Sequence, residues 1–306
     1  MLKVLVTGGT GFIGSHVVDS LVESGQTVAI VDNLSTGSKE NLNKKALFFE
    51  VDITSNNLTS VFEEFRPEVV IHLAAQVNVN RSIIDPVNDQ KTNIFGTVNV
   101  LENCRKFKVR KLVYSSSAAV YGFPKYNPIN EGHSTDPISF YGISKLVPEF
   151  YIKNYSALFN LEFTILRYSN VYGPRQDFLG EGGVVSIFLN NILRSKPINV
   201  FGNGEQSRDF IYVLDVVSAN IIAATTDING IFNISTNNSV TINKLMETLE
   251  RVSGTSINPI YKDARIGDIE KSCLDNQHAK KWLKWDPIFE LEMGLKRTFD
   301  FYKSLL

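Results

Sequence analysis

Short apolar runs alternate with amphipathic stretches through the first half of the chain. The runs are rich in Val, Ile, Leu and Phe, as buried strands are, and lie at Lys3–Thr7, Thr27–Asp32, Leu47–Asp52, Glu68–Ala74, Lys111–Ser115 and Glu162–Tyr168. Helical segments between them are expected near Phe12–Ser24, Leu58–Phe65, Pro86–Lys106 and Phe140–Phe159. Strands buried on both faces and joined by helices predict an α/β fold with a doubly wound parallel sheet, which binds ligands at the carboxyl ends of its strands.

The pattern changes after Tyr172. The segments become shorter and more polar, with turn signals such as Asn203-Gly204. A helix is expected near Val184–Ser195, strands at Arg208–Val213 and Gly230–Ile234, and a last helix near Leu291–Tyr302. We expect a smaller second lobe and a chain that crosses between the lobes more than once. The first domain would hold residues 1–171 and about 209–238, and the second about 172–208 and 239–306.

The composition argues against several classes of function. The 306 residues are 43% hydrophobic and 21% charged, with 31 basic and 32 acidic side chains and a net charge of -1. This balance shows no footprint for nucleic acid or for a membrane surface. The two cysteines, Cys104 and Cys273, suit a reducing compartment, although two thiols can in principle pair. With no signal-peptide layout and no apolar run of bilayer length, a cytoplasmic protein is expected.

A glycine-rich loop follows the first expected strand and opens the first expected helix. In Thr7-Gly-Gly-Thr-Gly-Phe-Ile-Gly14, the glycines Gly8, Gly11 and Gly14 recur every three residues. Such glycines let the backbone approach a pyrophosphate, which the helix N-terminus stabilises. Asp32 lies about 20 residues on, where a carboxylate binds the adenosine ribose and repels a 2′-phosphate. The loop therefore predicts a dinucleotide site that prefers NAD to NADP, against the alternatives of a ligand-free turn and a turn-capping aspartate.

A second candidate motif combines Tyr141 and Lys145 with the serine run Ser115-Ser116-Ser117. Residues four apart share one face of a helix, so the phenol and the ammonium can enter one site. A fixed cation favours the phenolate, and a lowering of the pKa by about three units is worth roughly 4 kcal/mol. A serine hydroxyl from a strand end would complete a proton relay to a substrate. The spacing alone is also typical of a solvated helix face.

Taken in order, these motifs resemble those of the extended short-chain dehydrogenase/reductases, in the NAD-dependent epimerase/dehydratase family. The resemblance rests on Gly8-x-x-Gly11-x-x-Gly14, the serine run followed by Ala-Ala-Val-Tyr-Gly122, and Tyr141-x-x-x-Lys145. It continues through Leu166-Arg-Tyr-Ser-Asn-Val-Tyr-Gly-Pro-Arg175 and Arg208-Asp-Phe-Ile-Tyr-Val-Leu-Asp215, so it covers essentially the whole chain. It implies a Rossmann-type sheet with a smaller α/β C-terminal substrate lobe, bound NAD, a UDP-sugar substrate and a homodimer.

The resemblance also assigns residues to roles. Tyr141 would be the catalytic base, Lys145 would bind the nicotinamide ribose and lower the tyrosine pKa, and Ser117 would assist, with Ser116 as the fallback. The cofactor would contact Gly8, Gly11, Phe12, Ile13, Gly14, Asp32, Asn33, Asp52, Ile53, Leu73, Ala74, Ala75, Asn93, Tyr141, Lys145 and Tyr168. The substrate would contact Ser117, Asn170, Val185, Phe201, Arg208, Arg265, Asp268 and Ser272, with the two arginines on the diphosphate. No metal site is expected.

The implied reaction is epimerisation of a UDP-hexose at C4, between UDP-glucose and UDP-galactose, through a transient 4-keto sugar. Family members that eliminate water carry an Asp-Glu pair just after the active-site hydroxyl, where this chain has Ala118 and Ala119. The alternative that stays open is an epimerase of UDP-N-acetylglucosamine or of both sugar types. Three further alternatives are less favoured: an epimerase of UDP-glucuronate, a dehydratase or reductase, and a non-catalytic NAD-sensing protein. The last is disfavoured because Ser117, Tyr141 and Lys145 are all present.

Three further positions carry expectations. By resemblance, Ser272 lies near the C2 substituent of the sugar, and its small side chain would admit an N-acetyl group unless it turns away from the pocket. Pro148 cannot donate a hydrogen bond to the Ser144 carbonyl, so a local kink is expected beyond the catalytic pair. Cys104 lies on an apolar helix face, which favours packing over a nucleophilic role.

Overall fold

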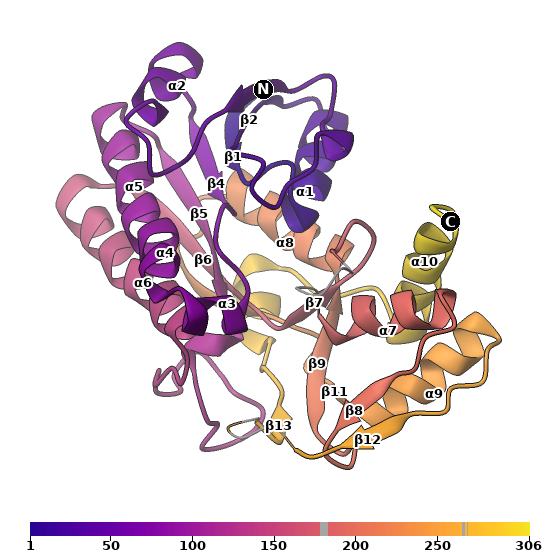
Figure 1. Cartoon of the computed structure of the whole chain (residues 1–306). Coiled ribbons are helices and arrows are strands. Elements are labelled where there is room, and N and C mark those ends of the chain that lie inside the picture. Colours follow the sequence, from indigo (N-terminus) through magenta and orange to yellow (C-terminus); the bar gives the residue numbers. More distant parts are fainter. Residues whose placement is uncertain (178–182, 265–266, 268) are drawn as a thin grey trace.

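Seven parallel strands form the central sheet of the computed structural model, which describes residues 1–177, 183–264, 267 and 269–306 (Figure 1). Its order is β10-β6-β5-β4-β1-β2-β3. The strands are β1 (Lys3–Thr7), β2 (Thr27–Asp32), β3 (Leu47–Glu50), β4 (Val69–His72), β5 (Lys111–Ser117), β6 (Glu162–Tyr168) and β10 (Gly230–Ile234). The order reverses between β1 and β4, and a doubly wound sheet binds ligands at such a reversal. The predicted Rossmann-type α/β class is confirmed.

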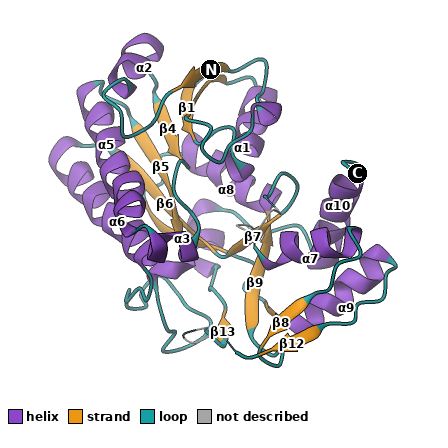
Figure 2. Cartoon of the chain, viewed as in Figure 1, coloured by secondary structure: helices purple, strands orange, loops and turns teal. Residues whose placement is uncertain are grey.

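Helices cover both faces of this sheet, as Figure 2 shows. On one face lie α1 (Phe12–Glu23) and α8 (Val213–Thr225), and on the other α2 (Leu58–Phe65), α5 (Gly96–Lys106) and α6 (Phe140–Phe159). Each face has its own apolar cluster, in which residues such as Val18 and Val217 pack on one side and Phe62 and Ile152 on the other. Because both faces are covered, the strands carry continuous apolar runs rather than alternating ones.

Most predicted elements of the first half are present within a few residues of their expected ends. The largest difference lies in Pro86–Lys106, which is expected as one helix. The structure divides it into α4 (Pro86–Gln90), a π-helical turn η2 (Lys91–Phe95) and α5. A short helix α3 (Val79–Ile84), which the sequence did not reveal, precedes them. Helix α6 spans Phe140–Phe159, as expected, with Pro148 inside it, and the kink expected at this proline stays a prediction.

The second half adds two small sheets. One contains β7 (Asn170–Tyr172), β9 (Ser207–Tyr212), β11 (Ser239–Thr241) and β13 (Lys271–Ser272), and the other pairs β8 (Asn199–Phe201) with β12 (Ile260–Lys262). Helices α7 (Val184–Leu193), α9 (Ile242–Ser253) and α10 (Leu291–Lys303) lie beside them (Figure 1). Short turns η1 (Lys39–Asn41), η3 (Ala118–Val120) and η4 (Ala279–Leu283) complete the described elements. The division into two domains at the stated boundaries stays a prediction.

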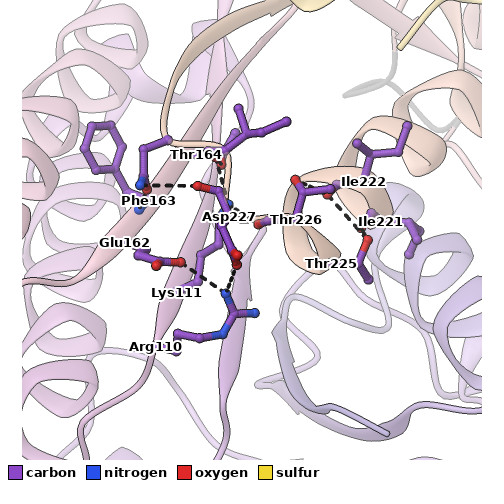
Figure 3. A network of polar contacts seen from close by, with 12 residues as sticks. Arg110, Lys111, Glu162, Phe163, Thr164, Ile221, Ile222, Thr225, Thr226 and Asp227 are labelled. Carbon is purple, nitrogen blue, oxygen red and sulfur yellow. Dashed lines mark hydrogen bonds and ion pairs between the residues drawn. The ribbon is translucent and has the colours of Figure 1, made fainter. Parts of the chain in front are cut away.

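A buried lysine lies at the amino ends of β5 and β6 (Figure 3). The Lys111 ammonium donates hydrogen bonds to the carbonyls of Thr226 (2.6 Å) and Ile228 (2.8 Å), just past the last residue of α8. Beside it, Arg110 pairs with Glu162 and Asp227. Since the carboxyl end of a helix carries partial negative charge, a cation there satisfies carbonyls that lack helical partners. Lys111 thereby fastens α8 to the sheet, far from its carboxyl edge.

Within the described ranges, no helix is both long enough and apolar enough to cross a membrane.

Candidate active site

The glycine loop lies where the strand order reverses, between β1 and β4. Gly8 has a φ of 71°, and a Cβ there would lie 2.7 Å from the Ala74 nitrogen. A Cβ on Gly14 would lie 2.0 Å from the Gly8 carbonyl oxygen. Both positions therefore require glycine, because the loop packs directly on the start of α1 and on the segment after β4. The result is a backbone cradle at a helix N-terminus, which suits a pyrophosphate.

Asp32 ends β2 beside this cradle. Its carboxylate accepts hydrogen bonds from the backbone nitrogens of Thr10 (3.0 Å) and Leu34 (2.9 Å). These two bonds leave further acceptor capacity, since an ionised carboxylate can accept about four. The nearby Thr10 Oγ1 is one of the buried side-chain oxygens that have no hydrogen-bond partner among the described residues. A cradle closed to any Cβ, a placed carboxylate and an unpartnered hydroxyl fit a dinucleotide such as NAD.

Tyr141, Lys145 and Ser117 meet at the carboxyl end of β5. Tyr141 stands in the first turn of α6, whose N-cap Ser139 accepts a hydrogen bond from the Gly142 nitrogen (3.0 Å). Lys145 follows one turn later and is buried. Ser117 ends β5, and its side chain lies near enough to Tyr141 to lower the pKa of the phenol. The structure thus brings the three predicted catalytic residues together, although their roles stay predictions.

The pKa values at this site follow from burial. Burial raises the pKa of Tyr141, while the nearby Ser117 hydroxyl lowers it. This net direction is opposite to the one expected from the spacing of Tyr141 and Lys145, because desolvation of the phenolate outweighs the protein groups that favour it. Burial also lowers the pKa of Lys145, to about 8, against the opposing effects of Asp89 and Glu149.

Ser116, the fallback for the catalytic hydroxyl, faces a different partner. Its hydroxyl donates to the Glu149 carboxylate (2.6 Å), which also receives two hydrogen bonds from Arg167. Successive side chains of a strand point to opposite faces, so Ser116 and Ser117 cannot both face the same site. This favours Ser117 as the hydroxyl beside Tyr141. The sequence reasoning missed Glu149 and Arg167, although they fall within the quoted helix and the Leu166-Arg-Tyr segment.

Asn93 joins the cofactor side of the site to α6. It lies in the π-helical turn η2, is buried, and donates hydrogen bonds to the Gln76 carbonyl (2.9 Å) and to the Ser144 hydroxyl (2.9 Å). Its side-chain oxygen accepts from the Gln76 nitrogen (2.8 Å). A π-helical turn shifts the residues that follow it relative to a regular helix, and such turns are frequent at functional sites. Asn93 therefore links the segment after β4 to the turn that carries Tyr141 and Lys145.

The remaining predicted cofactor residues surround the same edge of the sheet. Phe12 and Ile13 are half-buried in the first turn of α1, and Leu73, Ala74 and Ala75 follow β4. The Asp52 carboxylate accepts from Thr54 and Asn33, while Ile53 is buried. The Tyr168 ring is also buried, and its hydroxyl bonds to Asn220 of α8.

The predicted substrate residues lie on the elements of the second half. Asn170 begins β7 and is exposed, while Val185 is buried in α7 and Phe201 is half-buried in β8. Arg208 of β9 pairs in register with Ser272 of β13, so the two side chains lie on one face of that small sheet. Arg265 and Asp268 lie outside the described residues. The structure thus brings Arg208 and Ser272 together.

The histidines and cysteines take structural positions. His72 is buried between the hydroxyls of Thr7 (2.7 Å) and Thr97 (2.9 Å), and burial lowers its pKa to about 3, so it is neutral. Cys104 and Cys273 are free and buried. Cys104 packs in the apolar cluster under α5, as expected, and burial raises the pKa of its thiol. Within the described part of the chain, no group of three His, Cys, Asp or Glu residues could hold a metal ion.

The chain matches the model of the NAD dependent epimerase/dehydratase family over residues 4–235. It is 45% identical over 302 residues, 98% of both chains, to a putative UDP-glucose 4-epimerase of Methanocaldococcus jannaschii. It is similar to the crystal structure of UDP-glucose 4-epimerase from Thermotoga maritima with UDP-glucose, at 46% identity, a TM-score of 0.97 and 99% coverage of each chain. A UDP-N-acetylglucosamine 4-epimerase from Methanobrevibacter ruminantium M1, in complex with UDP-N-acetylmuramic acid, aligns at 35% identity and a TM-score of 0.95, over 100% of this chain and 99% of that one.

Proposed function

The chain belongs to the NAD-dependent epimerase/dehydratase family, and we propose that it interconverts UDP-glucose and UDP-galactose by epimerisation at C4. Family membership and close relatives make it an NAD-dependent isomerase of the nucleotide-sugar epimerase class. The observation that carries the proposal is the meeting of Tyr141 and Ser117 in one buried site, with Lys145 one turn further along α6, at the same edge of the sheet as the glycine cradle.

In the proposed reaction, Tyr141 removes the proton of the sugar 4-hydroxyl, and Ser117 holds that hydroxyl and relays the proton. Lys145 supplies a fixed positive charge that favours the phenolate of Tyr141. When bound, NAD supplies the group that accepts hydride from C4 and returns it, together with a positive nicotinamide ring. The 4-keto sugar then turns about its diphosphate, which Arg208 would hold, and presents its other face.

Two alanines favour epimerisation over elimination. Ala118 and Ala119 form the 3₁₀ turn that follows Ser117, where the dehydratases of this family carry carboxylates. A methyl group can neither take a proton from C5 nor protonate a leaving 6-hydroxyl. The oxidised sugar therefore has no acid–base pair at these positions to divert it from return of the hydride.

A second substrate class is favoured by Ser272. It is half-buried and lies opposite Arg208, the proposed diphosphate ligand. A hydroxymethyl side chain leaves room for an acetamido group at C2 of the sugar, and the M. ruminantium relative is a UDP-N-acetylglucosamine 4-epimerase. We therefore propose that UDP-N-acetylhexosamines are also substrates.

A homodimer is also proposed, with a second copy of this chain as the partner. Exposed apolar side chains gather on α3, α4 and α6, which pack together, and they include Ile83, Ile84, Val87, Ile143, Phe150, Tyr151 and Leu158. Light scattering should give a dimer mass, and a double substitution of Ile84 and Val87 by Glu should give a monomer. Ile288→Glu, at an equally exposed isoleucine elsewhere, should not change the mass.

The function is tested with purified protein and a panel of UDP-sugars, without added NAD. Interconversion of UDP-glucose and UDP-galactose is expected, and Tyr141→Phe should reduce kcat by at least about 100-fold, because general acid–base catalysis contributes on that order. Turnover within a few-fold of the native enzyme in Tyr141→Phe would exclude Tyr141 as the base. If no UDP-hexose is turned over although NAD is bound, the proposed substrate is wrong.

A further inference from the structure

Asp89 is a buried carboxylate that the proposed reaction does not use. It lies in α4 with 1% of its surface exposed. Its Oδ1 accepts hydrogen bonds from the side-chain amides of Gln76 (2.7 Å) and Asn93 (3.2 Å). Both donors are neutral, and Asp89 forms no salt bridge within the described ranges. A buried charge that only neutral groups solvate is costly, so a compensating cation is expected nearby.

Lys145 is a buried cation on the neighbouring helix α6. It is 3% exposed, and its ammonium lies 5.0 Å from the centre of the Tyr114 ring. Like Asp89, it forms no salt bridge in the part of the chain that the structure describes. The two charges nevertheless act on one another, and Asp89 is the strongest of the charged groups that favour the ammonium. Helices α4 and α6, which carry them, pack together (Figure 1).

The other titratable groups around Lys145 cannot take this role. Glu149, one turn further along α6, is already neutralised by the Arg167 guanidinium. His72 of β4 is uncharged, because burial lowers its pKa to about 3. Tyr114 of β5 and Tyr141 of α6 are neutral phenols, since burial raises the pKa of each. Of the two carboxylates that favour the Lys145 ammonium, Asp89 is therefore the one that has no guanidinium or ammonium bound to it within the described residues.

Asn93 connects Asp89 to the helical turn that carries Lys145 through hydrogen bonds. The same amide nitrogen that donates to Asp89 also donates to the Ser144 hydroxyl (2.9 Å), next to Lys145. Ser144 in turn donates to the Tyr141 carbonyl (3.1 Å). A displacement of Asp89 would therefore reach the helical turn that carries Tyr141 and Lys145.

We propose that Asp89 is a positioning residue that keeps the Lys145 ammonium charged inside the buried site. Its negative charge offsets the cost of desolvating the ammonium, and its hydrogen bond to Asn93 holds that charge at a fixed place below α6. The proposal rests on the proposed function for its kinetic consequence, but the charge state of Lys145 does not depend on which sugar is turned over.

The test uses Asp89→Asn, which keeps the shape and the acceptor for Gln76 but removes the charge. The control is Asp85→Asn, an exposed N-cap aspartate of the same short helix, since Asn caps a helix as well as Asp. The pH at which Lys145 is half protonated is measured by competitive acetylation with acetic anhydride and peptide mass spectrometry. The same variants are assayed for kcat as a function of pH.

In Asp89→Asn, the labelling midpoint of Lys145 and the alkaline limb of kcat should both move down by about one pH unit or more. Asp85→Asn should move neither. A fall in kcat with both midpoints unchanged would mean a merely structural role and would overturn the proposal. If no sugar is turned over, the proposed function fails, and the labelling experiment still decides the role of Asp89.

A stability cycle provides a second test. Lys145→Met strands the buried Asp89 charge, whereas Lys145→Met combined with Asp89→Asn removes both charges. Lys145→Met should therefore raise the unfolding equilibrium constant by a factor roughly ten times larger in the wild-type background than in Asp89→Asn. Equal effects in the two backgrounds would show that the charges do not interact and would contradict the proposal.

Discussion

Glu149 and Arg167 form a two-bond ion pair in the layer between α6 and the sheet, with the guanidinium Nε 2.9 Å and its Nη2 2.5 Å from the two carboxylate oxygens. Both side chains are almost completely buried. The pair ties the catalytic helix to β6 directly beneath the site. The same carboxylate receives the Ser116 hydroxyl (2.6 Å), so one buried anion fixes the end of β5 as well.

Glu149→Gln should destabilise the protein by about 3–5 kcal/mol in urea unfolding, because it leaves the Arg167 guanidinium buried without an anion. The exposed pair Lys39–Glu50 provides the control. Glu50→Gln should cost less than about 1 kcal/mol. A loss of similar size in both variants would contradict the assignment of Glu149 as the anchor of α6.

The double variant Glu149→Gln with Arg167→Met sharpens this prediction. It removes the stranded guanidinium, so much of the lost stability should return, as when a buried ion pair is replaced by neutral side chains. If the double variant loses as much stability as the two single variants together, or more, the pair does not act as a unit.

Gly8 and Gly25 allow the glycine cradle to be separated from simple backbone strain. Both have positive φ, 71° and 78°, but a Cβ on Gly8 would lie 2.7 Å from the Ala74 nitrogen, whereas Gly25 faces open space. Gly25→Ala should therefore cost only the left-handed strain of about 1–2 kcal/mol. Gly8→Ala should cost more, because the backbone after β4 must move, and it should release NAD during gel filtration. Equal stability and equal NAD content would mean that the loop relaxes freely.

The sequence predicted the large sheet well because its signals are local. Apolar runs of strand length, a glycine loop between strand and helix, and an aspartate at the end of β2 each depend on neighbours in the chain. The confirmed fold class follows from these patterns. The short strands β11 and β13 were not predicted, because two or three residues carry no measurable periodicity, and their pairing with β9 comes from distant parts of the chain.

In the candidate site too, the sequence predicted what depends on neighbours in the chain and missed what depends on distant contacts. Tyr141 and Lys145 were found by their spacing, but Asp89 was not, because nothing in the sequence shows that α4 packs on α6. The π-helical turn at Lys91–Phe95 was also missed, since its residues continue a helical pattern and differ only in their hydrogen bonds. The direction of the Tyr141 pKa was wrong because helix spacing does not show how deeply a side chain is buried.

The buried Lys111 should make the stability of the protein depend on pH. Burial lowers the pKa of its ammonium to about 8, against the raising effect of Glu162. An unfolded lysine has a pKa of about 10.4, so between the two values the unfolded chain binds a proton that the folded chain does not. The stability that Lys111 contributes is thus fully present at pH values above its pKa in the unfolded chain. It is lost as the pH falls through its pKa in the folded protein, about 8.

The measurement compares native protein with Lys111→Met in urea at several pH values from about 7.5 to about 9.5. The free energy of unfolding of the wild-type protein minus that of Lys111→Met should increase as the pH rises. Exposed Lys39, replaced by Met, is the matched control for loss of a lysine at the surface. A constant difference for Lys111→Met would show that Lys111 keeps an ordinary pKa in the folded protein.

Ser272 tests how the substrate pocket selects the group at C2 of the sugar. Its side chain lies on the same face of the small sheet as Arg208, whereas the preceding Lys271 is exposed and points to the opposite face. Ser272→Tyr should fill the space proposed for an acetamido group. We expect kcat/KM for UDP-N-acetylglucosamine to fall by about 100-fold or more, and kcat/KM for UDP-glucose to change only a few-fold, since steric exclusion acts on the larger substrate alone. Lys271→Tyr adds the same bulk to the other face and should leave the ratio of the two values unchanged. If Ser272→Tyr lowers both values equally, Ser272 does not face the C2 substituent, and the proposed breadth of substrates must come from another part of the pocket.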